Sequence, residues 1–537
     1  MEGQAVPRRP SGRPRLTKAS AARAGSRTRA EGVARAVKTV GYWERRIGRV
    51  DVKRRWLRRV GCAAAALALA GCGSDSSSPA TPSAAPPAPV APATVPLPSA
   101  PDQTRLLDAA YRVDVQRVEV AFDIFPVERE VRVWSATTFR MRAGQSRPIV
   151  HFSPAGSGTD VALALNGEGL DLRRESDVRL LRFETSGQDS VEIQRDLADG
   201  VAHRLEASHV LPLTDAFGRF FTDVNDIEGR GNEVLFPTLN TPHELARHRL
   251  VFRVHDAEPY VCVGSGRVTP GTAAGVQQWV LDTEREVASY TVMFFLAPAA
   301  DVVQVERRVQ GVDVRVVAAL GGASPAEALA QLDPWLPELR EALGPFPMPR
   351  GLSIVLTEGG GGMEYYGATI TSLRALRHEV FHMYFGCSTV AQTYRDSWWD
   401  EAIDMWYELS MDPAFPAIAP GYRSGIVGAR TPVTVGFDRR AYDEGARIMQ
   451  AVARELGGRE QMVAFLRHLH QRRFFDPFTT RTLASEIRAF SGADFHERFQ
   501  RWLYSDTEVA AAGESPYAWL HRVDMTPPAT TRRLDER

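Results

Sequence analysis

Several features are scarce in this chain of 537 residues, and each scarcity excludes a class of protein. Four cysteines, at positions 62, 72, 262 and 387, are too few for a disulfide scaffold and lack the spacing of a metal knuckle. The apolar run from Val60 to Ala70 is far too short to be a permanent membrane-spanning helix. We expect Cys262 and Cys387 to be small buried side chains; a disulfide between them is the less favoured alternative.

Basic charge is also scarce outside the N-terminal segment. Residues 1–72 hold 18 of the 65 basic residues and 4 of the 65 acidic ones, which leaves 47 basic and 61 acidic residues for positions 73–537. An acidic folded portion gives no electrostatic basis for binding nucleic acid. The length and the apolar fraction of 44% predict at least two globular domains.

A lipoprotein signal is predicted at 51–72. Basic residues at 53–59 precede the apolar run, which ends in Leu69-Ala70-Gly71-Cys72. This ending resembles the bacterial lipobox, whose cysteine is acylated; an ordinary secretory signal with a chance cysteine is the alternative. The Gly-Ser-Asp-Ser-Ser-Ser run after Cys72 favours the lipobox. We therefore expect lipidation at Cys72 and a protein held by acyl chains at a membrane of the bacterial cell envelope, on its extracytoplasmic side.

The segments around this signal have compositions that do not build a core. Residues 1–50 are rich in Arg, Ala and Ser without hydrophobic periodicity, and we expect a non-native extension or a disordered segment. Residues 73–104 are Ser, Pro and Ala with almost no charge, which predicts an extended linker. Residues 509–537 are expected to be a loosely ordered tail.

Residues 105–310 alternate apolar and polar side chains in short runs, as at 113–120, 131–134, 178–183 and 250–254. Runs of period two separated by Gly, Asp and Asn predict antiparallel strands in a sheet or sandwich. The histidines of this segment lack metal-ligand spacing, so we expect solvated or structural roles for His203, His209, His243, His248 and His255.

A candidate metal site dominates residues 311–508. His378 and His382 are spaced i and i+4, which places both imidazoles on one face of a helix. Glu379 then lies beside the metal without being a ligand. Eighteen residues separate His382 from Glu401, which opens a second helix and can supply a third ligand. Three protein ligands leave one position of a zinc ion open, as in catalytic sites, so the pattern predicts one Zn²⁺ per chain in a zinc hydrolase.

The surrounding pattern predicts a mainly helical domain with a small sheet. Helices are expected at 324–343, with Ser324 and Glu327 as a capping box, and at 372–386 and 397–409. Strands are expected at 312–320 and 352–356. Further short helices are predicted at 461–472, 484–491 and 495–504, and we expect His468 and His470 to be solvated because they lie on different helix faces.

The expected chemistry uses two more residues. Glu379 would take a proton from the attacking water and later deliver it to the leaving amine. Tyr442 begins a helix and can donate a hydrogen bond to the tetrahedral oxyanion. Glycines at 359–362 beside a strand allow an extended substrate to approach a sheet edge closely, although a Gly run is otherwise typical of a flexible loop.

Taken together, these residues resemble the aminopeptidase N family of gluzincin zinc metallopeptidases. His378, His382 and Glu401 match its zinc motif in spacing, and Tyr442-Asp443-Glu444-Gly445 stands where the family has Tyr-Glu-Lys-Gly. Gly361, Gly362, Met363 and Glu364 resemble its Gly-x-Met-Glu-Asn motif, whose glutamate holds the substrate α-amine. The resemblance covers about 105–508, including Phe236-Pro237 and Ala288-Ser289-Tyr290 in the β-rich part. It implies an α+β fold in which an antiparallel β saddle precedes a thermolysin-like catalytic domain, and a function in removing N-terminal residues from peptides.

The chain departs from this family on the substrate side. Tyr365 replaces the usual Asn, Glu444 the usual Lys, and thirteen residues separate Glu364 from His378, a short interval for the family. The helical C-terminal domain of the family is not expected here. An open cleft of this kind leaves two alternatives: a zinc endopeptidase or other amidase, and an envelope binding lipoprotein with little turnover. The sequence does not predict the substrate preference or the oligomeric state.

Overall fold

The structure is a computed structural model of the whole chain, and all the residues that it describes belong to one compact unit, Pro86–Arg537. The predicted signal with Cys72, the linker and the tail lie outside the described residues. The described ranges are 113–142, 144–151, 159–182, 189–212, 235–239, 245–392, 396–426 and 439–503.

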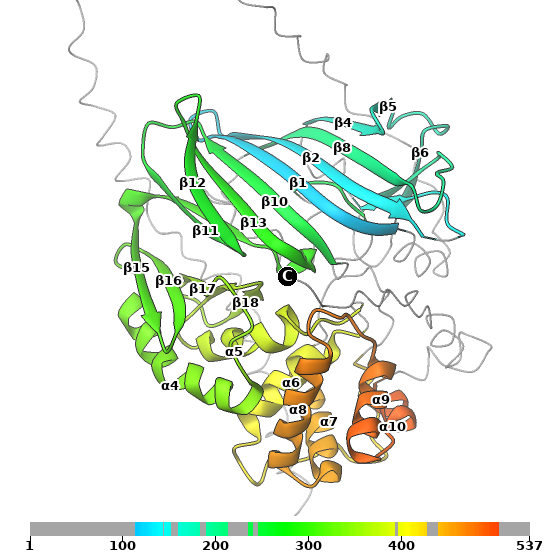
Figure 1. Cartoon of the computed structure of the whole chain (residues 1–537), viewed down its shortest axis with the longest axis vertical. Helices are drawn as coiled ribbons and strands as arrows, with labels where there is room; N and C mark the ends of the chain where they lie inside the picture. The colour runs from blue at the N-terminus through cyan, green and yellow to red at the C-terminus, as the bar shows by residue number, and fades with distance from the viewer. Residues whose placement is uncertain are drawn as a thin grey trace, which may run out of the picture. The chain divides into compact units, whose positions relative to one another are not determined.

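The β-rich part is built on one eight-stranded sheet, in which β1 (Val113–Phe125) is central. β1 pairs antiparallel with β2 (Glu130–Met141) and parallel with β10 (Leu245–Val254). The predicted period of two is confirmed along β1, where Val118, Val120, Phe122 and Ile124 are buried. Figure 1 shows the long strands side by side; the order is β12-β13-β10-β1-β2-β8-β4-β5. The remaining strands are β4 (Thr159–Leu165), β5 (Glu168–Leu170), β8 (Ala202–Pro212), β12 (Arg267–Ala273) and β13 (Val276–Ala288).

Among the described residues of this part, two smaller sheets and two single turns of 3₁₀-helix accompany the large sheet. The first sheet has four short strands in the order β6-β7-β3-β9, and the second pairs β11 with β14. Their bounds are β3 (Ile149–His151), β6 (Val178–Arg182), β7 (Asp189–Ile193), β9 (Thr238–Leu239), β11 (Tyr260–Gly264) and β14 (Phe294–Pro298). The turn η2 (Ser289–Thr291) follows β13, and η3 (Ala299–Asp301) follows β14.

A five-stranded sheet opens the second part of the fold. Its order is β15-β16-β17-β19-β18, with parallel pairing among the three middle strands and antiparallel pairing at both edges. The bounds are β15 (Val302–Val309), β16 (Val312–Ala319), β17 (Leu352–Leu356), β18 (Gly362–Tyr365) and β19 (Ala368–Thr371). Helix α4 (Pro325–Leu343) connects two parallel strands, and Ser324 caps it as predicted, accepting a hydrogen bond from the backbone N–H of Glu327.

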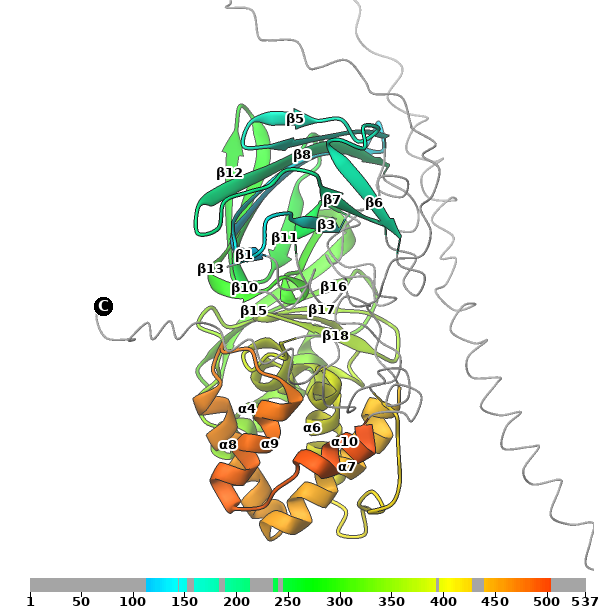
Figure 2. The same ribbon diagram turned by 90° about the vertical axis from the view of Figure 1, so that its right-hand side faces the viewer.

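Helices gather on one side of this sheet (Figure 2). They are α5 (Leu376–Phe381), α6 (Trp398–Leu409), α7 (Arg440–Leu456), α8 (Arg459–Arg472), α9 (Thr480–Ser491) and α10 (His496–Leu503), with a π-helical turn, η4 (Met383–Cys387), directly after α5. Within the described ranges, no helix is long and apolar enough to cross a membrane.

Two expectations need correction. The helix expected at 372–386 is regular only over Leu376–Phe381, because Phe385 is extended and Gly386 has φ 119°, a conformation that breaks the helix. His470 is buried rather than solvated, and its Nε2 lies 3.1 Å from Ser388 Oγ.

Other expectations in this part of the chain agree with the structure. Cys262 and Cys387 are buried free thiols, as expected. His209 and His248 are buried in the β-rich part, which agrees with structural roles.

Candidate metal centre

Helix α5 and its end carry the first two candidate ligands. Leu376, Val380 and Phe381 are fully buried and fix the helix against the core, which leaves His378 on the opposite face. His382 closes the helix with helical backbone angles, one turn after His378. Both imidazoles therefore project from one face, as the i, i+4 spacing predicts.

Helix α6 supplies the third candidate ligand, Glu401. Trp398, Trp399 and Trp406 are buried and anchor the helix, so Glu401 in its first turn is held against α5. The candidate donor atoms of the three side chains lie close together. His378 Nε2 lies 3.2 Å from His382 Nε2 and 3.1 Å from Glu401 Oε2, and His382 Nε2 lies 3.4 Å from the same oxygen.

This triangle of donor atoms fits a zinc ion. Zinc bonds to imidazole nitrogen and carboxylate oxygen are roughly 2.0–2.2 Å long, so the edge of a zinc tetrahedron is about 3.4 Å. The three measured separations between donor atoms are close to that edge. Two imidazole nitrogens and one carboxylate oxygen are also the donor chemistry of catalytic zinc sites. His378, His382 and Glu401 together can hold one metal ion.

Two aspartates of α6 contact the outer nitrogens of both imidazoles. Asp400 Oδ1 lies 2.8 Å from His382 Nδ1, and Asp404 Oδ2 lies 2.9 Å from His378 Nδ1. Carboxylates in this position fix the ring orientation and tautomer of a metal-binding histidine and raise its basicity. Neither aspartate is predicted to have a role from the sequence pattern. The available signal was their position, since they stand one residue before and three residues after Glu401.

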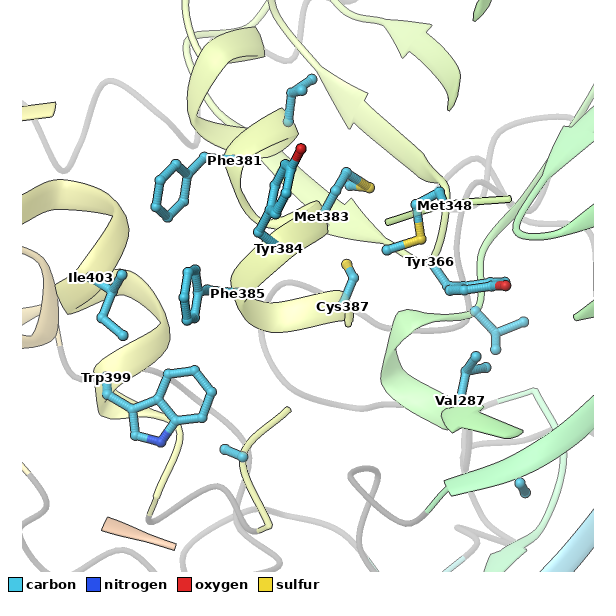
Figure 3. Close-up of a cluster of buried hydrophobic side chains, with 14 of the residues drawn as sticks. Val287, Met348, Tyr366, Phe381, Met383, Tyr384, Phe385, Cys387, Trp399 and Ile403 are labelled. Atoms are coloured by element: carbon cyan, nitrogen blue, oxygen red, sulfur yellow. The ribbon is translucent and has the colours of Figure 1, made fainter. Parts of the chain in front are cut away.

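The helix break at Gly386 brings backbone close to the pair His382–Asp400. A Cβ on residue 386 would lie 2.8 Å from Asp400 Oδ1 and 3.2 Å from His382 Nδ1. The carbonyl oxygen of Phe385 also lies 2.9 Å from His382 Nδ1. Figure 3 shows Phe385 facing Ile403 and Trp399, which packs this turn onto α6. Glycine is therefore required at 386 for both its φ angle and its closeness to the site.

Glu379 is buried beside the candidate ligands and packs against strand β18. A Cβ on residue 362 would lie 2.6 Å from the Glu379 side chain, so Gly362 leaves room for this carboxylate. Burial raises the pKa of Glu379 to about 8, although the two neighbouring imidazoles act to lower it. A carboxylate with a raised pKa next to a metal site suits proton transfer near neutral pH.

Tyr442 reaches the site from the first turn of α7. Its hydroxyl donates a hydrogen bond to Glu401 Oε1 at 2.5 Å, and burial together with that carboxylate raises the pKa of the phenol. A Cβ on Gly445 would lie 2.7 Å from the Cβ of Ala402, so the glycine allows α7 to pack closely on α6. The phenol thus stays protonated and available as a donor at the edge of the ligand set.

Glu364 lies on the edge strand β18 and is almost completely buried. Among the described residues, its Oε1 has no hydrogen-bond partner. Burial raises the pKa of Glu364, and the carboxylates of Asp400, Glu401 and Glu379 raise it further. Its side chain can also approach Glu379 and His382 closely enough to share a cation. Of the other predicted substrate-binding residues, Gly361 is exposed and Met363 packs partly into the core.

The electrostatics of the cluster favour a bound cation. Burial alone would lower the pKa of His378, but Asp404 and Glu401 outweigh it and raise that pKa to about 12. Burial would raise the pKa of Glu401, but the two histidines hold it below its ordinary value. Without a metal ion, the buried carboxylates of the cluster are therefore balanced by protonated imidazoles. A divalent cation replaces those protons, since metal binding needs neutral imidazole and ionised carboxylate.

Comparison with known proteins rests on structure, because neither the protein-family models nor the curated proteins contain a significant match to this chain. A two-domain M1 zinc metallopeptidase mutant bound to L-arginine superposes with a TM-score of 0.55 at 17% identity, over 73% of this chain and 94% of that one. The M1 zinc metallopeptidase from Deinococcus radiodurans gives a TM-score of 0.53 at 19% identity, with the same coverage of both chains. The chain has the fold of the M1 zinc metallopeptidases.

A third solved structure adds a bound peptide. It is a mutant M1 zinc metallopeptidase from Deinococcus radiodurans bound to a Tyr-Ser-Ala substrate, with a TM-score of 0.55, 18% identity and coverage of 73% of this chain and 94% of that one. The predicted fold class, a β-rich N-terminal domain followed by a mainly helical domain with a small sheet, is confirmed. At this level of identity the likeness establishes the architecture.

Proposed function

We propose that the protein is a zinc-dependent peptidase in which His378, His382 and Glu401 hold one zinc ion. The observation that carries this proposal is the triangle of Nε2, Nε2 and Oε2 atoms separated by 3.1–3.4 Å, with a carboxylate behind each imidazole. The shared fold of the M1 zinc metallopeptidases supports the same assignment.

The side chains around the ligands divide the work of peptide hydrolysis. When bound, zinc would supply a Lewis acid that activates water and polarises the scissile carbonyl. Glu379 accepts the proton of the attacking water and passes it to the leaving amine. Tyr442 shifts its hydrogen bond from Glu401 to the oxyanion that develops on the carbonyl oxygen when water attacks the carbonyl carbon. Gly362 keeps the substrate side of Glu379 open beside the edge strand β18.

We infer further that the substrate end recognised here is a free α-amine. Glu364 is a buried carboxylate whose Oε1 has no partner in the part of the chain that the structure describes, and it lies close to Glu379. A substrate ammonium group placed there would supply both the missing hydrogen bond and the missing charge. This arrangement favours an aminopeptidase, which removes residues from the N-terminus of a peptide.

The experiment that tests the function compares peptide hydrolysis by the wild-type chain and by Glu379→Gln. We expect the variant to keep its zinc and to lose at least about a hundredfold in kcat, the usual contribution of a general base. Unchanged hydrolysis in Glu379→Gln would contradict the mechanism.

A second experiment compares the free and N-acetylated forms of one peptide to separate the two peptidase classes. An aminopeptidase does not cleave the blocked peptide, whereas an endopeptidase does. Binding of peptides without turnover would indicate the binding lipoprotein.

We also propose that acylation of Cys72 tethers the enzyme to a membrane of the bacterial envelope. The support is the sequence Leu69-Ala70-Gly71-Cys72 after a basic and apolar segment. Metabolic labelling with a fatty acid should mark the wild-type protein and leave Cys72→Ser unlabelled. Equal labelling of both proteins would refute the proposal.

A further inference from the structure

The short turn η2 contacts both backbone segments that carry the candidate site. Tyr290 is buried, and its hydroxyl donates a hydrogen bond of 2.6 Å to the carbonyl oxygen of Gly386 in η4. The next residue, Thr291, accepts a hydrogen bond of 2.7 Å from the backbone N–H of Tyr366, which directly follows β18. Two adjacent residues of the β-rich part therefore bind the turn after His382 and the residue that follows the strand carrying Glu364.

The Gly386 peptide matters because it lies directly against the pair His382–Asp400. The backbone at 385–386 places the Phe385 carbonyl oxygen 2.9 Å from His382 Nδ1 and leaves no room for a Cβ beside Asp400. His382 Nδ1 thus has two oxygen neighbours, one from the carboxylate and one from this peptide. A shift of the peptide would change which oxygen the ring faces, and with it the direction of Nε2.

We propose that Tyr290 is a positioning residue for His382: it holds the Gly386 carbonyl and, through the backbone of Gly386, the preceding Phe385 carbonyl that faces the ring. This inference rests on the proposed zinc site. The phenol binds the Gly386 carbonyl, while Asp400 contacts the ring itself. The hydrogen bond joins residues 96 positions apart, so the β-rich domain takes a direct part in shaping the metal centre.

The chain offers a matched control in Tyr384. This tyrosine belongs to the same turn, η4, is also buried, and donates its hydroxyl to a backbone carbonyl, that of Gly344, at 3.0 Å. Gly344 caps the C-terminus of α4, so this hydrogen bond anchors the turn without touching the Gly386 peptide. Tyr290→Phe and Tyr384→Phe each remove one oxygen atom and one buried phenol–carbonyl hydrogen bond.

Zinc affinity, measured by competition with a chromophoric chelator, tests the proposal independently of activity. We expect Tyr290→Phe to lower zinc affinity by about tenfold, the lower end of the effect of outer-sphere partners, and Tyr384→Phe to leave it within twofold of wild type. The visible spectrum of the cobalt-substituted protein should change in Tyr290→Phe alone. Equal affinities and spectra for wild type and Tyr290→Phe, or equal losses in both variants, would overturn the proposal.

A double-mutant cycle with Asp400→Asn adds a second test. If Tyr290 acts through the surroundings of His382, the two substitutions should cost less zinc affinity together than the product of their separate effects. Strictly multiplicative losses would overturn the proposal. A wild-type chain that binds no zinc would refute the proposed function itself, whereas normal wild-type zinc affinity with an unaffected Tyr290→Phe variant would refute this inference alone.

Discussion

Asp400 Oδ1 lies 2.8 Å from His382 Nδ1, and both side chains are buried where the chain leaves helix α5. Asp400 stands immediately before Glu401, so one turn of α6 provides both a candidate ligand and the acceptor that orients another. The two groups are thus coupled by the backbone of a single helix, and any rotation of α6 moves them together.

Removal of the Asp400 carboxylate should weaken zinc binding without abolishing it. We expect Asp400→Ala to lower zinc affinity by roughly 10–100-fold, because His382 loses the carboxylate that fixes its ring. Asp400→Asn keeps an acceptor oxygen and should lose less. Chelator competition on the purified variants measures both effects, and equal affinity of Asp400→Ala and wild type would contradict the assigned role.

Asp404 should contribute both to zinc affinity and to the stability of the zinc-free protein. Both of its carboxylate oxygens are buried, and Oδ2 lies 2.9 Å from His378 Nδ1. Without a cation, Asp404 pairs with the protonated His378, and loss of one partner of this buried pair should destabilise the fold, so Asp404→Asn should unfold at a lower temperature after chelation. The same variant should bind zinc more weakly, by about tenfold. A gain in either quantity would argue against this account.

Tyr442→Phe should reduce turnover with little change in zinc content. The phenol donates to Glu401 Oε1 in the structure and is placed to donate to the oxyanion during hydrolysis. Loss of one oxyanion donor costs on the order of 10²–10³ in kcat. Steady-state kinetics with an unblocked peptide, beside metal analysis of the same sample, checks the prediction. An unchanged kcat would remove Tyr442 from the mechanism.

Acid should destabilise the β-rich domain through its buried histidines. Burial lowers the pKa of His209 and of His248 to about 4, from an ordinary value of 6.5. A histidine with a lower pKa in the folded chain binds fewer protons when folded, so its stabilising contribution is present above pH 6.5 and is lost as the pH falls towards 4.

His248→Gln should therefore reduce the difference between the free energies of unfolding at pH 7 and pH 4.5. The expected reduction is about 2 kcal/mol, within the limit set by the pKa shift of this one group. Urea unfolding at the two pH values measures this difference, and an equal pH response of wild type and His248→Gln would refute the assignment.

Local patterns were enough to predict most of the fold. The strand β1 follows from its period of two, and the helix α4 follows from its periodicity and its cap, because each buries one face against the core. The convergence of His378, His382 and Glu401 follows from spacing on two helices. The break at Gly386 was not foreseen, because the preceding residues have helical periodicity, and both the φ angle of Gly386 and its contact with Asp400 arise from tertiary packing.

Several contacts around the site join residues that are far apart in the sequence, and a local sequence pattern cannot predict such contacts. The hydrogen bond from Tyr290 to Gly386 spans 96 residues and joins two differently built domains. The contact from Asp404 to His378 depends on the angle between α5 and α6, which packing of the buried tryptophans decides. The burial of His470 likewise follows from its contact with Ser388 after the helix break.

Metal analysis of the purified protein is the most direct test of the central claim. The account predicts one zinc ion per chain in the wild-type protein, lost on substitution of His382 by Ala and retained in Glu379→Gln. A wild-type chain that contains no zinc and takes up none from solution would contradict it.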